Sequence, residues 1–313
     1  MNKAAPKVGF GLPVYNGERF LRVAIESVLA QTFTDFELII SDNASTDSTQ
    51  EIVRDFARRD PRIRYVRNTH NIGVAQNFNQ AFTQSTAPYF RWVAHDDYLE
   101  PQWLAACVRI LDERPEVVLA HTYVNRVDRN GQIFGKKPME FRVRHERPSE
   151  RFAAVVRDRE GSGVWGLMRS DVLRTTPLHG SYPGSDTVFV AEMALRGRFA
   201  FHEEYLFNLR EHDFRHTGRA MTPEEEWEWW GQTRFRSRFL IAPRVYYHMR
   251  QAIRRANLSA GERMSCYRHL GACVRGYMGA TSLRILNRLR GRVVNAPDPN
   301  NQGSSMSVQK SNA

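Results

Sequence analysis

Two adjacent aspartates, Asp96 and Asp97, are the residues with the clearest capacity for chemistry in this chain of 313 residues. They follow, after His95, an apolar run over 89–94 that predicts a buried strand. Neighbouring carboxylates repel one another unless a cation lies close to them. Hard divalent ions such as Mg²⁺ and Mn²⁺ are often held by one or two carboxylates together with substrate phosphates. The pair therefore predicts a divalent metal site or, as the plainer alternative, a cap for a helix that begins near Pro101.

Three earlier polar loops also follow apolar runs, and each could contact a ligand. They are Pro13-Val14-Tyr15-Asn16, Ser41-Asp42-Asn43-Ala44-Ser45-Thr46-Asp47 and Asn68-Thr69-His70-Asn71-Ile72-Gly73. Ligands of open α/β sheets bind outside the carboxyl ends of the strands, so we expect all four loops to meet at one edge. The first loop has neither a G-x-G-x-x-G nor a G-x-x-x-x-G-K-[ST] pattern, which argues against a dinucleotide fingerprint and a P-loop.

The elements that must position these loops are predicted by the spacing of apolar residues. Strands are expected over 8–12, 36–40, 63–66, 89–94 and 117–123, and helices over 18–31, 49–59, 73–84 and 101–113. Their alternation through short links predicts an α/β fold, with a mostly parallel sheet and helices on both faces. Further along, Asn130-Gly131 predicts a hairpin, 186–196 a helix, 199–209 strand, and 223–294 mainly helix.

Positive charge is concentrated near the C-terminus. The net charge is +11, yet residues 231–313 hold 15 Lys and Arg against Glu262 and Asp298, and residues 1–230 are close to neutral. Residues 260–292 combine apolar positions at helical spacing with arginines, which predicts either docking on an anionic membrane or packing on the rest of the protein. No nucleic-acid-binding module accompanies the charge, so no nucleic acid is expected as a partner.

The cysteine content and the lengths of the apolar runs indicate the cellular compartment in which we expect the protein. Three scattered cysteines argue against a disulfide framework and a cysteine-based zinc site. No apolar run approaches the ~20 residues of a membrane span, and residues 1–7 lack the apolar segment of a signal peptide. We expect a cytoplasmic protein, with peripheral contact at the inner face of the membrane as an option.

The four loops, in this order and spacing, resemble the nucleotide-sugar half of glycosyltransferase family 2, and the resemblance extends over about 7–212. It implies the Rossmann-like type A fold, an inverting reaction and Mg²⁺ or Mn²⁺. It also implies a nucleoside diphosphate sugar as donor, UDP-linked because Asp42 would favour uracil. The implied catalytic domain covers 1–222, with a nucleotide-sugar half at 7–123 and an acceptor half at 124–222. A basic helical extension would follow at 223–294, and a disordered tail at 295–313.

The resemblance also implies roles for single residues. The nucleotide-binding set would be Pro13, Val14, Tyr15, Asn16, Asp42, Asn71, Gly73 and Asp96. Pro13 and Tyr15 would pack against the nucleobase and ribose. Asp42 would accept a hydrogen bond from the base, which favours uracil; its alternative role is that of a turn residue. Asp96 and Asp97 would hold the metal on the diphosphate, and His212 would complete that site.

The acceptor side is implied by two further segments. Asp186 matches the aspartate that serves the family as general base, and its alternative role is that of a helix N-cap. Trp165 and Gly166 belong to a segment that resembles the acceptor-side strand, where Trp165 would stack on a sugar or else pack in the core. The acceptor would be a glycan or a lipid-linked glycan, as in the synthesis of surface polysaccharides.

Three positions differ from the family pattern. Ala94 stands where an acid is frequent, Gln76 where arginine is frequent, and Ser185 where glutamate is usual. The changes at Ala94 and Ser185 motivate an alternative function: a catalytically inactive binding or scaffold protein on the same fold. A nucleotidyltransferase is a third hypothesis, but the loop after the first strand is not the glycine-rich basic loop with which such enzymes usually begin.

Overall fold

The computed structural model describes residues 5–138, 145–158, 161–213 and 241–289, together with 222, 225 and 229. The expected tail at 295–313 lies outside these residues. The chain divides into two compact units, Met1–Leu270 and Gly271–Ala313, and the division falls within the last helix. Among the described residues, no helix has both the length and the apolar character to cross a bilayer.

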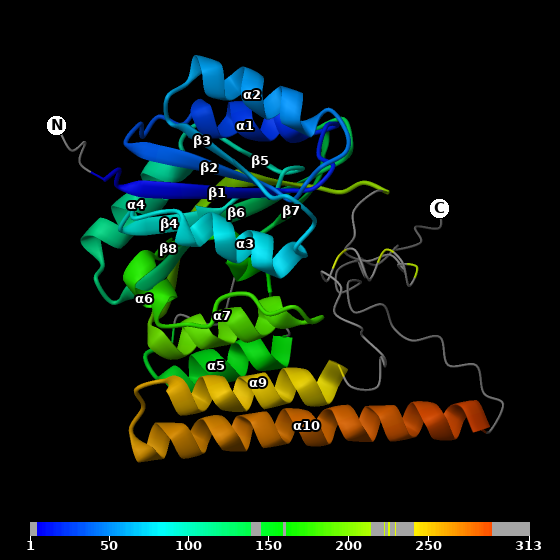
Figure 1. Cartoon of the computed structure of the whole chain (residues 1–313). Coiled ribbons are helices and arrows are strands. Elements are labelled where there is room, and N and C mark those ends of the chain that lie inside the picture. The colour runs from blue at the N-terminus through cyan, green and yellow to red at the C-terminus, as the bar shows by residue number, and fades with distance from the viewer. Residues whose placement is uncertain are drawn as a thin grey trace, which may run out of the picture. The chain divides into compact units, whose positions relative to one another are not determined.

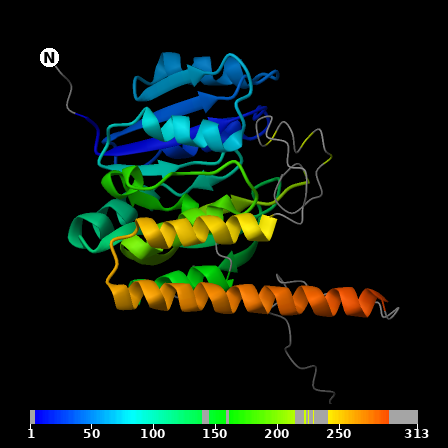
Figure 2. The ribbon, with the colours of Figure 1, turned by 60° about the horizontal axis from the view of Figure 1, so that its bottom comes forward.

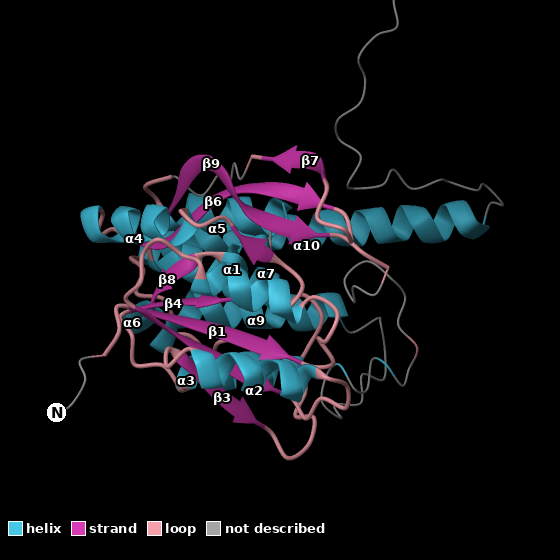
Figure 3. Cartoon of the chain, turned by 90° about the horizontal axis from the view of Figure 1, so that it is seen from above, coloured by secondary structure: helices cyan, strands magenta, loops and turns pink. Residues whose placement is uncertain are grey.

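A parallel four-stranded core opens the first unit (Figures 1 and 3). It is formed by β1 (Val8–Val14), β2 (Phe36–Asp42), β3 (Ile63–Arg67) and β4 (Tyr89–Trp92), in the spatial order β3-β2-β1-β4. All seven residues of β1 are buried, which explains why this strand is apolar throughout rather than alternating. The four predicted strands are confirmed, with ends that shift by a few residues.

The sheet continues with mixed pairing. The three-residue strand β8 (Leu167–Arg169) runs antiparallel to both β4 and β6 (Val117–Val127). β6 pairs in parallel with β9 (Arg198–Arg210), β5 (Tyr98–Leu99) is antiparallel to β9, and β7 (Ile133–Lys137) forms the predicted hairpin with β6. The sheet is therefore mostly parallel but carries antiparallel insertions in its second half.

Helices pack on this sheet as the sequence predicts. They are α1 (Leu21–Leu29), α2 (Thr49–Arg59), α3 (Val74–Thr83) and α4 (Trp103–Glu113). α3 packs on β1 and β2, whereas α4 packs on β6 and β9. Each buries one apolar face; α4, for example, buries Trp103, Leu104, Cys107 and Leu111.

A second group of helices follows in the chain. Its members are α5 (Pro148–Asp158), the short 3₁₀ helix η1 (Ser162–Trp165), α6 (Ser170–Arg174), α7 (Ser185–Arg196), α9 (Ile241–Arg255) and α10 (Ala260–Leu289). α5 and α9 both pack on α7 (Figures 1 and 2). Glu192 of α7 is 1% exposed and pairs with Arg196 of its own helix and with Arg255 of α9, both at 2.9 Å. This buried carboxylate therefore fixes α9 against α7.

Candidate functional site

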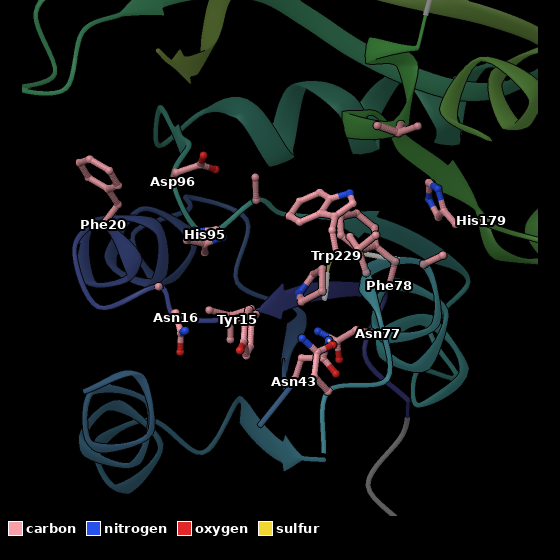
Figure 4. Close-up of a pocket in the computed structure, with 18 of the residues that line it drawn as sticks. Tyr15, Asn16, Phe20, Asn43, Asn77, Phe78, His95, Asp96, His179 and Trp229 are labelled. Carbon is pink, nitrogen blue, oxygen red and sulfur yellow. The ribbon is translucent and has the colours of Figure 1, made fainter. Parts of the chain in front are cut away.

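A cavity of about 840 Å³ opens where β1 and β2 end, between α3 and the start of α7 (Figure 4). Most of the residues singled out from the sequence lie in its wall: Pro13, Val14, Tyr15, Asn16, Asn71, Asp96, Trp165, Asp186 and His212. Asp42, Gly73, Asp97 and Gly166 are not among the lining residues and lie directly beside residues that are. The four predicted loops thus meet at one edge, as expected for the carboxyl ends of neighbouring parallel strands.

Side-chain amides hold the loops that follow β2 and β3. The Asn43 Nδ2 donates to Asn71 Oδ1 at 2.6 Å, and Asn43 Oδ1 accepts the backbone N–H of Ile72 at 2.9 Å. Gly73 donates its N–H to Asn71 Oδ1 at 2.8 Å and has φ +86°, a conformation that favours glycine. Gly73 therefore shapes the loop that presents Asn71 to the cavity.

Asp42 lies at the end of β2 with its carboxylate fully buried. Oδ2 accepts hydrogen bonds from the Tyr65 hydroxyl at 2.6 Å and from Arg67 at 3.0 Å, while Oδ1 accepts the Ser45 N–H at 2.8 Å. Burial, and then the hydrogen bond to Asp42, raises the pKa of Tyr65 to about 12. In this structure the carboxylate secures the loop whose next residue, Asn43, faces the cavity; its contact with a nucleobase stays a prediction.

The two adjacent aspartates point to different places. Asp96 lies in the cavity wall, and its Oδ2 is 3.1 Å from Nε2 of His212. Asp97 is 2% exposed, and its Oδ1 accepts the backbone N–H of Arg210 at 2.8 Å. Arg210 in turn donates from Nε to the carbonyl of Asp96 at 2.8 Å. Asp97 and Arg210 therefore tie this loop to the end of β9, and Asp96 and His212 face the cavity. A contact of Asp97 with a metal stays a prediction.

These two cavity-facing groups fit a divalent cation that arrives with a diphosphate. A carboxylate oxygen and an imidazole nitrogen are both ligands that Mn²⁺ accepts, and substrate phosphates supply further oxygens. Among the described residues, no group of three or more His, Cys, Asp and Glu side chains gathers as a self-sufficient metal site.

A buried guanidinium lies behind the aspartate pair. Arg91 of β4 is fully buried, with its guanidinium 3.8 Å from the centre of the Trp103 ring and 5.0 Å from that of Phe207. Burial lowers the pKa of Arg91 to about 9, although the nearby Asp97 carboxylate acts in the opposite direction. The Arg91 guanidinium remains cationic near neutral pH, so it compensates the negative charge of the Asp97 carboxylate.

Asp186 faces the cavity from the start of α7. The N-cap of this helix is Gly184, with φ +83°, so Asp186 is the second helical residue, and no side chain caps the helix. Its side chain is 59% exposed, and Oδ1 lies 3.4 Å from Nδ1 of His179. The position is that of an accessible carboxylate rather than that of an N-cap.

Aromatic rings form the wall between the two ends of the cavity (Figure 4). Phe78 lies 6.1 Å from Trp165 and 5.2 Å from His179, measured between ring centroids. Trp165 is partly exposed in this wall rather than buried in the core. Trp229 also lines the cavity.

Sequence reasoning did not single out Phe78 or His179. Both come from stretches without a recognisable motif, and only the fold brings them to Asp186 and Trp165. His70 and His95 carried no expected role; of these, His95 lines the cavity.

Residues 10–174 match the family described as "Glycosyl transferase family 2". The chain is 35% identical to a chondroitin synthase of Escherichia coli over 134 residues, which cover 42% of this chain and 19% of that protein. It is 28% identical to an uncharacterized glycosyltransferase, MJ1057, of Methanocaldococcus jannaschii over 142 residues, 44% of this chain and 49% of the other. The matches thus span less than half the length of these curated relatives.

Solved structures share the fold at low sequence identity. TarS 1–349 of S. aureus in complex with UDP superposes with a TM-score of 0.59 at 18% identity, covering 84% of this chain and 70% of that one. The same protein in complex with UDP-GlcNAc gives 0.62 at 17% identity, covering 84% and 71%. The likeness supports the α/β architecture described above.

Proposed function

The chain belongs to glycosyl transferase family 2, and from this premise we propose that it transfers a sugar from a UDP-linked donor to a hydroxyl group of a glycan, with inversion at the anomeric carbon. One observation carries the proposal. A single cavity has the nucleotide-side loops at one end, Asp96 and His212 along its wall, and Asp186 beside an aromatic wall.

The donor would lie across the ends of β1 and β2. Pro13 and Tyr15 offer an apolar surface for the base and ribose, and Asn43 and Asn71 offer amides at the rim. The TarS structures with the same fold hold UDP or UDP-GlcNAc, which supports a uridine donor. Val14, Asn16 and Gly73 would complete this end of the site.

The diphosphate would lie near Asp96 and His212, which would hold Mg²⁺ or Mn²⁺, while Asp97 would fix the loop from behind. When bound, such a cation neutralises charge that develops on the leaving diphosphate. Asp96 contributes a ligand oxygen, and the Asp97–Arg210 contact keeps that oxygen in the cavity wall.

Asp186 would act as the general base. The acceptor hydroxyl is a weak nucleophile, so a carboxylate in hydrogen-bond reach must take its proton as its oxygen bonds to the anomeric carbon. The bond from that carbon to the diphosphate breaks in the same step, and the diphosphate leaves with the electron pair. Because the acceptor attacks from the face opposite the leaving group, the anomeric configuration inverts.

The acceptor would be a carbohydrate. Trp165, beside Gly166, and Trp229 present aromatic surface in the wall of the cavity that Asp186 also lines, and sugar rings stack on such surfaces. The relative named chondroitin synthase supports a role in polysaccharide synthesis. We further propose that 1–222 form the catalytic part, and that the basic extension at 223–294 holds the protein at the cytoplasmic face of a membrane that carries a lipid-linked acceptor.

A donor screen tests this function. Purified protein is incubated with UDP-, GDP- and dTDP-sugars, with and without Mn²⁺, and products are identified by mass. We expect Mn²⁺-dependent release of UDP from one UDP-sugar, loss of that release in Asp96→Asn, and retention in Asp158→Asn, an exposed aspartate at the end of α5. Absence of binding and hydrolysis with every donor would instead support an inactive scaffold.

A further inference from the structure

We infer that His179 is a positioning residue that holds the Asp186 carboxylate for proton transfer. The inference rests on the proposed function, because it concerns the residue assigned there as general base. It is carried by the contact between the two side chains and by the way in which the fold fixes the histidine.

Three aromatic side chains hold the ring of His179. The ring stacks on Phe189 of α7 with centroids 4.8 Å apart and an angle of 21° between the planes. It meets Trp92 edge-on at 4.7 Å and Phe78 edge-on at 5.2 Å. The side chain is only 4% exposed, although it borders the cavity (Figure 4). These contacts therefore fix the plane of the ring.

The backbone of His179 is fixed as firmly as its ring. The Asn79 side chain of α3 donates to the His179 carbonyl at 2.9 Å and accepts the His179 N–H at 3.0 Å. The preceding residue, Leu178, has φ +59°, a left-handed conformation that is unfavourable for a non-glycine residue. A leucine keeps such a conformation only where the surrounding structure holds it there.

The ring nitrogens have unequal surroundings. Nδ1 lies 3.4 Å from Asp186 Oδ1, whereas the buried Nε2 has no hydrogen-bond partner within the part of the chain that the structure describes. A neutral imidazole carries one N–H, and a carboxylate only accepts hydrogen bonds when ionised. We therefore place the proton on Nδ1, which faces Oδ1 of Asp186, so that Oδ2 is left for the acceptor hydroxyl.

This contact restricts the rotation of an otherwise 59% exposed carboxylate, and it thereby keeps the proposed base in one position for proton transfer. The loop also brings Tyr182 towards Asp186, and α9 packs Arg244 and His248 against the Tyr182 ring at 5.1 and 4.4 Å. Burial raises the pKa of Tyr182, so this phenol stays neutral. Arg244 and His248 are unchanged in every variant of His179 and Phe189, so they do not account for differences between those variants.

The first test compares His179→Phe, which keeps an aromatic ring but removes the donor, with His179→Asn, whose amide can replace Nδ1–H. The control is Phe189→Leu, which alters the ring stack and keeps the donor. UDP release from the UDP-sugar found in the donor screen is followed against donor concentration. For His179→Phe we expect kcat to fall by up to ~10²-fold with little change in donor KM. His179→Asn should recover most of the lost rate.

Equal loss of kcat in His179→Phe, His179→Asn and Phe189→Leu would reduce His179 to a packing residue. Wild-type kcat in His179→Phe would overturn the inference as well. Failure of the proposed function looks different, because Asp186→Asn would then retain full activity, or no donor would react.

A second measurement does not require turnover. The ¹⁵N shifts of the imidazole nitrogens in histidine-labelled protein report which nitrogen carries the proton. We expect the Nδ1–H form for His179 in the wild type and a changed pattern in Asp186→Asn. An Nε2–H form in the wild type would contradict the inference even if every variant proved inactive.

Discussion

Replacing Asp186 by Asn separates the catalytic role of this carboxylate from a structural one. The change keeps the shape of the side chain and removes its charge and basicity. Asp186 is the second residue of α7, is 59% exposed and caps no N–H group of that helix. The structural cost should therefore be limited to the interaction with the helix dipole, about 0.3–1 kcal/mol, because the amide oxygen of asparagine can still face Nδ1 of His179.

The catalytic cost should be far larger. A positioned general base contributes about 10²–10⁴-fold, which corresponds to roughly 2.7–5.4 kcal/mol of transition-state stabilisation. The matched control is Asp171→Asn, because Asp171 is also the second residue of a helix, α6, and is exposed outside the cavity. The assay follows UDP release and product mass, while urea unfolding measures stability.

We expect both variants to unfold within about 1 kcal/mol of the wild type, and only Asp186→Asn to lose transfer by at least ~10²-fold. Equal turnover in the two variants would refute the assignment of the base. A large loss of stability in Asp186→Asn would show that the carboxylate is structural.

Three further predictions concern the scaffold around the site. Tyr65→Phe removes a hydrogen bond to the buried Asp42 and should cost about 1.5–3 kcal/mol in urea unfolding, whereas an unchanged midpoint would mean that this contact is not formed. Glu192→Gln leaves Arg255 without its carboxylate and should cost about 3 kcal/mol, with faster hydrogen exchange in α9; exchange that matches the wild type would disprove the clamp. His121 is fully buried, and burial followed by the charge of Arg91 lowers its pKa to about 3. In the unfolded chain the histidine binds a proton with a pKa near 6.5. The stability that neutral His121 contributes to the folded state is therefore complete above that pH and declines as the pH falls towards 3. At about pH 5.5 the decline amounts to about 1.4 kcal/mol. His121→Phe should flatten this part of the pH dependence of stability, and an identical slope would contradict the burial argument.

The sequence predicted the parallel half of the sheet because each of its strands is a buried apolar run that ends at a polar loop. β1, from Val8, and β2, from Phe36, are recognisable in this way. The loops were then expected together, since the carboxyl ends of parallel strands share an edge, and the cavity residues Tyr15, Asn71 and Asp96 follow that rule.

The second half was less predictable because its contacts join distant segments. β8 has only three residues, and its antiparallel position between β4 and β6 depends on both neighbours rather than on its own pattern. The helix α5 follows a polar stretch of sequence, and its apolar face is buried by packing on α7, which is distant in the chain. Local periodicity carries no information on such pairings.

The site, like the fold, combines residues that a local motif predicts with residues that only distant contacts bring into place. Asp96 and Asp97 are equivalent as a motif, yet in the bend between β4 and β5 one faces the cavity and the other accepts the N–H of Arg210. His179 lies in the loop between α6 and α7, where the sequence has no periodic pattern that would single it out. Its significance depends on Phe78, Trp92 and Phe189, which come from three separate elements.

Calorimetric titration of UDP into the wild-type protein, with and without Mn²⁺, tests the central claim most directly. If the cavity is a donor site, UDP binds with one-to-one stoichiometry, Mn²⁺ strengthens binding, and His212→Ala removes the strengthening by Mn²⁺ without abolishing binding of UDP alone. No heat of binding for UDP under either condition would contradict the claim that this edge of the sheet holds a nucleoside diphosphate.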